Sequence, residues 1–203
     1  MKKTQVTTLC TVGAALAIGA AAPLMANDSN ARKFGAQLSG YNEVHFIAGN
    51  AAATPPVAPA LRGAVSTMAK GTFTTRIDDK LETIYYTLTY EGLEGAVTQA
   101  HIHFGQHHSV GGIVVWLCQT AGTPAPAVAA GLTPFCPEPG GTVTGTIVPA
   151  QVLAQAAQGI GAGEFGELVR AIRAGATYAN VHSILHPPGE IRGQLREGDG
   201  HRH

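Results

Sequence analysis

The sequence is poor in charged, aromatic and sulfur-containing residues. Of 203 residues, 13 are Lys or Arg and 13 are Asp or Glu, and aromatic residues make up 6% of the chain. Removal of an N-terminal segment that carries Lys2 and Lys3 would leave 11 basic residues against 13 acidic ones. The resulting net charge of about −2 offers no basic surface to phosphate groups. We therefore expect no nucleic-acid partner and no attraction to an anionic membrane.

Long hydrophobic runs are also absent, except for one near the N-terminus. That run, Val12 to Ala22, follows the basic start Met1-Lys2-Lys3 and is shorter than the length of about 20 residues that spans a bilayer. A basic start, a short apolar run and a small residue at Ala26 predict a secretory signal peptide over residues 1–26. The protein is then periplasmic or secreted, with no membrane span after cleavage. An uncleaved N-terminal anchor is the alternative.

Only two cysteines follow the predicted signal peptide, Cys118 and Cys136. Two cysteines in an exported chain favour a disulfide bond. The segment between them contains Gly122, Pro124, Pro126, Gly131 and Pro134, so it forms no continuous helix or strand. A disulfide would restrain this segment. The alternative is a pair of cysteine metal ligands.

Short alternating segments dominate the rest of the chain. They are rich in β-branched and aromatic residues and are separated by turn signals such as Asp78-Asp79 and His186-Pro187-Pro188-Gly189. This pattern predicts an all-β sandwich or barrel. The expected strands are a first one with Phe34, Ala36 and Leu38 on one face, then 72–77, 82–90, 98–104, 112–117, 141–148, 178–184 and 190–195.

Two segments are expected to form short helices before the last strands. Residues 149–157 begin with proline and are rich in alanine. In residues 164–174, apolar side chains recur at helical spacing and Gly175 provides a stop. We expect residues 48–63 to form an exposed loop, residues 34–197 one domain and residues 198–203 a disordered tail.

The histidines suggest a metal site. His101 and His103 are two residues apart on an expected strand, so their side chains share one face, with Ile102 directed to the core. His182, on another expected strand, lies on the face opposite to Val181 and could provide a third ligand. Imidazole nitrogens suit copper and zinc, and copper is favoured on intrinsic affinity. Weaker candidates are His107, His108, His186 and His45.

The same histidines also allow interpretations without a metal. The His101-Ile102-His103 motif could be a solvated polar face, and His182 could be a structural, hydrogen-bonded histidine. His201 and His203 belong to the expected tail and are not candidates. The residues alone do not distinguish a metal site from these alternatives.

Six motifs in order resemble those of the CHRD (chordin-type) domain family. They are LSGYNEV at 38–44, AHIHFG at 100–105, GIVVWLC at 112–118, GTVTGTI at 141–147, YANVHS at 178–183 and GEIRGQL at 189–195. The resemblance implies an immunoglobulin-like antiparallel β-sandwich, of the single-domain kind found in many exported bacterial proteins. The chain departs from the family pattern after Val44. Family members usually continue with prolines at once, whereas in this chain His45 to Thr54 intervene before Pro55-Pro56.

The His-Ile-His strand is also similar to the paired copper-ligand histidines of copper/zinc superoxide dismutases, which are β-barrels. No bridging histidine or zinc-binding aspartate accompanies it, and no nucleophile-elbow sequence surrounds Ser109. We expect a non-enzymatic exported protein that binds copper, or alternatively zinc, through the strand histidines. An extracellular or envelope protein-interaction module without metal is the second hypothesis. A copper oxidoreductase of dismutase type is the third.

Overall fold

The computed structural model describes residues 32–44, 46–47, 51–56, 58, 60–61 and 63–198. The predicted signal peptide, His45 and residues 199–203 of the predicted tail lie outside this part of the chain. The strands are β1 Lys33–Ser39, β2 Phe46–Ile47, β3 Ala60–Leu61, β4 Lys70–Asp78, β5 Thr83–Glu91, β6 Val97–Phe104, β7 Gly112–Cys118, β8 Gly141–Ile147, β9 Thr177–Ser183, β10 Ile191–Gln194 and β11 Arg196–Glu197. The helices are α1 Ala127–Ala130 and α2 Phe165–Arg173, with 3-10 turns η1 Gly40–Asn42, η2 Pro149–Gln151 and η3 Ala156–Gln158.

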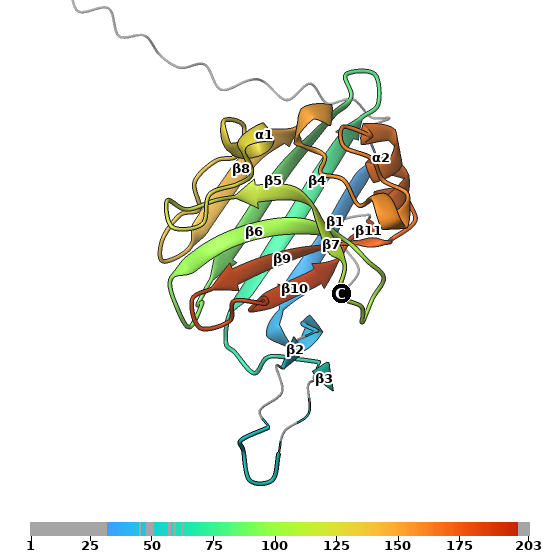
Figure 1. Ribbon diagram of the computed structural model, residues 1–203. Coiled ribbons are helices and arrows are strands. Elements are labelled where there is room, and N and C mark those ends of the chain that lie inside the picture. The colour runs from blue at the N-terminus through green and yellow to red at the C-terminus, as the bar shows by residue number, and fades with distance from the viewer. Residues whose placement is uncertain are drawn as a thin grey trace, which may run out of the picture.

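The strands form one antiparallel sheet that folds over into two layers. Along the path β7-β6-β9-β10-β1-β4-β5-β8, neighbouring strands are hydrogen-bonded, and β11 also pairs with β1. Figure 1 shows β7, β6, β9 and β10 in front of β1, β4, β5 and β8. The two ends of the path, β7 and β8, contact each other, so the sandwich is nearly closed. The predicted all-β antiparallel sandwich is confirmed.

The rear layer follows the alternation that the sequence predicts. Along β4 and β5, every second side chain is buried, as at Phe73, Ile84 and Leu88. The Asp78 carboxylate accepts hydrogen bonds from the backbone N–H groups of Lys80 and Leu81, which closes the β4–β5 turn. One face of this layer therefore packs on the core, as expected of an antiparallel sheet.

The front layer is buried on both faces. All seven residues of β9 are buried, as are residues 100–103 of β6. Ala100, Ile102, Ala179 and Val181 belong to the core between the layers. Because side chains alternate along a strand, their neighbours lie on the outer face, where loops cover them. This outer face carries the histidines.

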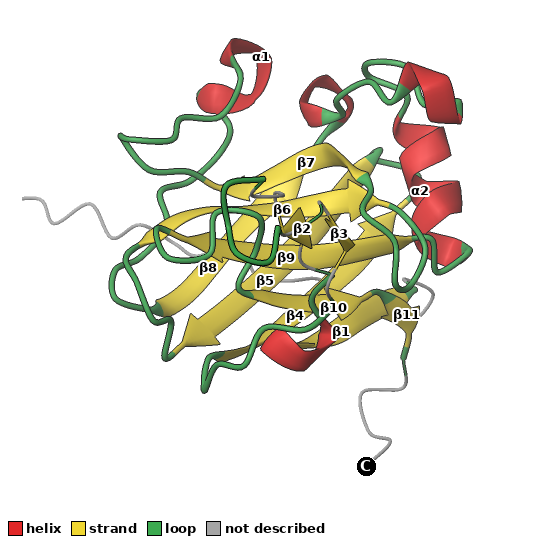
Figure 2. Cartoon of the chain, turned by 60° about the horizontal axis from the view of Figure 1, so that its bottom comes forward, coloured by secondary structure: helices red, strands yellow, loops and turns green. Residues whose placement is uncertain are grey.

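The helix predicted for 164–174 is confirmed as α2, but the one predicted for 149–157 is wrong. α2 buries its apolar face and lies at one edge of the sandwich (Figure 2). Residues 149–157 instead contain the turn η2 and the start of η3, with an extended stretch between them. There the backbone N–H of Leu153 donates to the carbonyl of Val114 on β7, at 2.9 Å. Tertiary pairing with a strand has overridden the helical propensity of alanine.

The predicted disulfide bond between Cys118 and Cys136 is present. Between the two cysteines, Gln119 organises the segment: its amide donates to the carbonyls of Ala130 and Thr133 and accepts from the N–H of Ala125. The four-residue helix α1 lies within this segment, which is otherwise irregular, as the sequence predicts. Residues 48–63, expected to form a loop, include the short strand β3, which pairs with β2. No helix among the described residues combines the length and apolar character needed to cross a membrane.

Candidate metal centre

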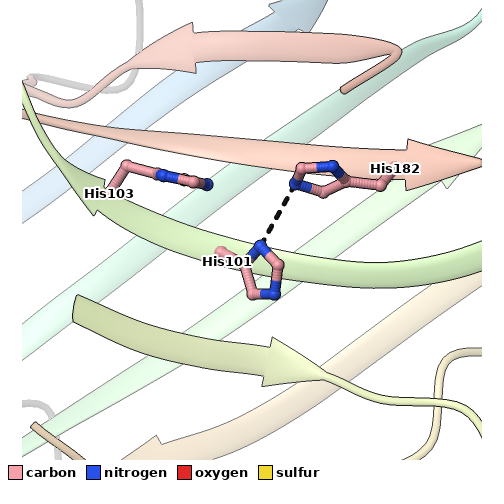
Figure 3. A group of neighbouring side chains, drawn as sticks. All are labelled: His101, His103 and His182. Carbon is pink, nitrogen blue, oxygen red and sulfur yellow. Dashed lines mark hydrogen bonds between the residues drawn. The ribbon is translucent and has the colours of Figure 1, made fainter. Parts of the chain in front are cut away.

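The structure brings His101, His103 and His182 together on the outer face of the front layer. β6 and β9 are antiparallel neighbours, in which His101 pairs with Asn180 and Gln99 with His182. This register places His182 diagonally across from His101, within reach of a ring on the same face. Figure 3 shows the three rings directed toward one another from the two strands.

The three imidazoles offer nitrogen atoms at short mutual distances. His101 Nδ1 lies 3.1 Å from His182 Nε2. One ring nitrogen from each of the three residues lies within 4.8 Å of the others. Two nitrogens bound to one ion at 2.0–2.1 Å lie roughly 3.3 Å apart at a tetrahedral angle. The His101–His182 pair matches this spacing, and a small rotation of the His103 ring would complete the set.

Backbone carbonyls fix which nitrogen of two rings carries the proton. His182 Nδ1 lies 2.8 Å from the carbonyl oxygen of Pro187, and His103 Nδ1 lies 3.0 Å from that of Gly111. Because a carbonyl only accepts, each Nδ1 donates and each Nε2 keeps its lone pair. A ligating histidine in proteins typically donates its other N–H to a carbonyl or carboxylate in this way.

Two nitrogens in the cluster have no hydrogen-bond partner among the residues that the structure describes. They are Nε2 of His101 and Nε2 of His103, and both are buried. A buried polar atom without a partner costs free energy, so such atoms in a folded protein call for a ligand or another compensation. An ion bound between the rings would satisfy the lone pair of His103. The residues present therefore fit a metal ion.

Burial keeps the three imidazoles neutral. Desolvation, followed by the neighbouring histidines, holds the pKa of His101 well below its ordinary value of 6.5. Desolvation lowers the pKa of His103 to about 3 and that of His182 to about 4. At neutral pH all three rings are thus uncharged, with one nitrogen of each ring free of a proton, which is the state that binds a metal. The cluster is composed of neutral nitrogen donors without a carboxylate.

Aromatic rings enclose the cluster. Trp116 on β7 contacts His101 edge-on, with ring centroids 4.3 Å apart. Tyr178 stacks on His103 at 4.7 Å, and the guanidinium carbon of Arg192 lies 3.3 Å from the centroid of the Tyr178 ring. These residues were not predicted from the sequence. Tyr178 and His182 are four residues apart on one strand, so the alternation could have placed Tyr178 on the histidine face, whereas Trp116 required the β6–β7 register.

The weaker candidates lie elsewhere. His107 and His108 are exposed on the loop between β6 and β7. His186 Nε2 lies 3.0 Å from a carboxylate oxygen of Glu94, and with Glu190 these residues form a second group of potential ligands. Glu190, however, already accepts hydrogen bonds from Thr67, Ser183 and the backbone of residue 94. We therefore interpret that group as structural.

The cluster is almost completely covered by protein. The exposed fractions of His101, His103 and His182 are 0%, 8% and 4%. A catalytic metal needs an accessible coordination position, whereas a structural metal site is closed. The arrangement can hold an ion and exclude water from it.

Comparison with known proteins assigns the chain to a family. No curated protein and no solved structure matches the sequence. A family model, the CHRD domain, matches residues 34–195, which include β1 from its second residue, the two strands of the histidine cluster and β10. The order of motifs and the antiparallel sandwich agree with this match. The chain belongs to the CHRD-domain family.

Proposed function

We propose that this CHRD-domain protein binds a copper ion through His101, His103 and His182 without catalysing a reaction. The observation that carries the proposal is the convergence of three neutral, buried imidazoles from two strands, two of them with their Nδ1 protons donated to carbonyls. Such a site holds its ion as a resident group and contributes its binding free energy to the folded state.

Copper is favoured over zinc by the donor set. Nitrogen ligands follow the order of affinity in which Cu²⁺ exceeds Zn²⁺. The cluster contains no carboxylate or thiolate that would add preference for zinc or a harder ion. We therefore propose copper as the ion and zinc as the alternative.

We place the protein in the periplasm or outside the cell. Two observations support this location: the N-terminal sequence has the features of a signal peptide, and the Cys118–Cys136 disulfide is of a kind that persists in oxidising compartments. The CHRD domain itself suggests an extracellular module. An envelope or extracellular protein partner is the alternative function if no metal binds.

Metal content of the mature, tag-free protein tests the proposal. We expect one copper ion per chain, with nitrogen hyperfine structure in electron paramagnetic resonance. Copper should also quench the fluorescence of Trp116, the one tryptophan of the chain, because its ring lies against His101. The double variant His101→Ala/His103→Ala should lose both signals.

A matched control is available in the same chain. His107→Ala/His108→Ala also removes two histidines, but from the exposed loop, and should retain the copper. His103→Gln, which keeps a donor for the Gly111 carbonyl, guards against loss of metal by misfolding. Equal copper in the wild type and in the folded His101/His103 variants would refute the site. If the wild type bound neither copper nor zinc, the protein-interaction module would remain as the proposed function.

A further inference from the structure

The buried cluster raises the question of how an ion reaches it. The three histidines are almost inaccessible, and the core residues Ala100 and Ile102 close the other face of β6. An ion can enter only if part of the cover on the outer face moves. Three segments make up this cover, and they differ in how firmly they are held.

Two of the three segments are held firmly. Trp116 packs with Ala125 and Ala129 in a small hydrophobic cluster of its own. The hairpin that supplies the Pro187 carbonyl to His182 contains two consecutive prolines, Pro187 and Pro188, which restrict its backbone. Moving either segment would expose apolar surface or require a restrained turn to change shape.

The third segment, the loop 105–111, is held by hydrogen bonds alone. It has a glycine at each end, and Gln106, His107, His108 and Val110 are exposed. Hydrogen bonds tie it to the sheet and to the residue before β9: His103 Nδ1 to Gly111 O, Gly111 N to Tyr178 Oη, Gly105 N to Ala176 O, Arg192 to the carbonyls of Ser109 and Gln106, and Gln194 to the carbonyl of Gly105. Water can replace such bonds when a glycine-flanked loop lifts. This loop is therefore the cover that opens most easily.

The loop carries a pair of exposed imidazoles. The ring centroids of His107 and His108 are 3.8 Å apart. Consecutive side chains of an extended chain point to opposite sides, but His108 has a left-handed backbone conformation, with φ of +62°, and its ring lies against that of His107. They are the only exposed histidines among the residues that the structure describes. They lie four and five residues from His103 along the chain, close to the Gly111 carbonyl that holds its ring.

We infer that loop 105–111 is the entry route for copper and that His107 and His108 capture the ion before passing it to His103. This inference rests on the proposed function of the buried cluster. Two imidazoles with water in the remaining positions bind Cu²⁺ reversibly, and they raise its local concentration at the loop. When the loop lifts, the His103–Gly111 hydrogen bond breaks, and the free Nε2 of His103 can replace a ligand of the captured ion. The transfer is a ligand exchange, so copper keeps its oxidation state.

The rate of copper loading tests the inference. Stopped-flow mixing with Cu²⁺ would follow the quenching of Trp116 in the wild type and in His107→Ala/His108→Ala. We expect the variant to reach the same final quenching and copper content, with a loading rate lower by about tenfold at limiting copper. Because the two side chains are exposed, the variant should keep its near-ultraviolet circular dichroism.

The outcomes separate the two proposals. The control His201→Ala/His203→Ala removes two histidines far along the chain and should load at the wild-type rate. Equal rates in all three proteins, equal slowing in both variants, or loss of copper at equilibrium from the loop variant would each overturn the entry route. A wild type that binds no copper would instead refute the proposed function.

Discussion

At the scale of single residues, two carbonyl groups decide what the histidine cluster can do. Without the bonds from His103 to Gly111 and from His182 to Pro187, the rings could turn or carry the proton on either nitrogen. With them, both Nε2 atoms face the cluster as acceptors. A solvated His-x-His face, which the sequence also allowed, would show neither the burial nor this orientation.

The carboxylate of Glu190 links three separate segments of the chain by hydrogen bonds. Its carboxylate is fully buried and accepts from the Thr67 hydroxyl at 2.9 Å, the Glu94 N–H at 2.8 Å and the Ser183 hydroxyl at 2.5 Å. Glu190→Ala would leave three donors without this acceptor, so we expect a loss of at least about 3 kcal/mol in the free energy of unfolding. Guanidinium denaturation of metal-free protein would measure it.

A suitable control is Glu91→Ala. Glu91 forms an ion pair with Lys70 at 3.0 Å, but both side chains are more than half exposed. Such a pair contributes at most about 1 kcal/mol. If the two variants lost similar stability, the carboxylate of Glu190 would not be the link between these segments.

At the scale of elements, the sequence was informative wherever a single strand sufficed. Alternation alone placed Ile102 toward the core and separated His182 from Val181, as the structure shows. It could not show that β6 and β9 are neighbours or that Gln99 pairs with His182, because pairing joins segments about 80 residues apart. Alternation also could not show that loop 105–111 covers the histidines, because the contacts of this loop with Arg192 are tertiary.

The hairpin between β9 and β10 allows a sharp test of an element. Gly189 has φ of +135°, and a Cβ there would lie 2.6 Å from both Asn180 Nδ2 and Glu43 Oε2. These atoms are hydrogen-bonded to each other at 2.5 Å and cannot move freely, since both residues are buried. Gly189→Ala should therefore lower the free energy of unfolding by about 2–3 kcal/mol, measured by denaturation. It should also weaken copper binding, because this hairpin supplies the Pro187 carbonyl to His182.

Gly131→Ala is the matched control for the hairpin. Gly131 has φ of −72°, and nothing lies within 4 Å of the position of an added Cβ among the described residues. Alanine there should change stability by less than about 1 kcal/mol. A Gly189→Ala protein as stable as this control would mean that the Asn180–Glu43 contact yields without cost.

At the scale of the whole molecule, closing loops over a polar sheet face couples stability to pH. Most antiparallel sandwiches leave the outer face of a layer to water. Here the outer face of β6 and β9 is covered, so three imidazoles that are free to bind protons in the unfolded chain cannot do so readily in the folded one. Protons and metal ions thus compete for the same nitrogens, and each favours a different state of the chain.

Acid should therefore unfold the metal-free protein. The ordinary pKa of histidine is 6.5, while in the folded protein burial lowers the pKa of His103 to about 3 and that of His182 to about 4. Between the unfolded-state and folded-state pKa values, the unfolded chain binds more protons than the folded one. The contribution of these two rings to the free energy of unfolding is therefore fully present above pH 6.5, and it falls as the pH decreases toward 4. At pH 5 the burial of each of these two rings should lower the free energy of unfolding by about 2 kcal/mol.

Comparison of wild type with His103→Gln isolates one ring. Glutamine does not titrate and can still donate to the Gly111 carbonyl, and every other titrating group is common to both proteins. The loss of unfolding free energy between about pH 7.5 and pH 5.0 should be smaller in the variant by about 2 kcal/mol. An equal loss in both proteins would mean that His103 accepts a proton without unfolding. Its ring would then have access to water, and the sealed site on which copper binding depends would not exist.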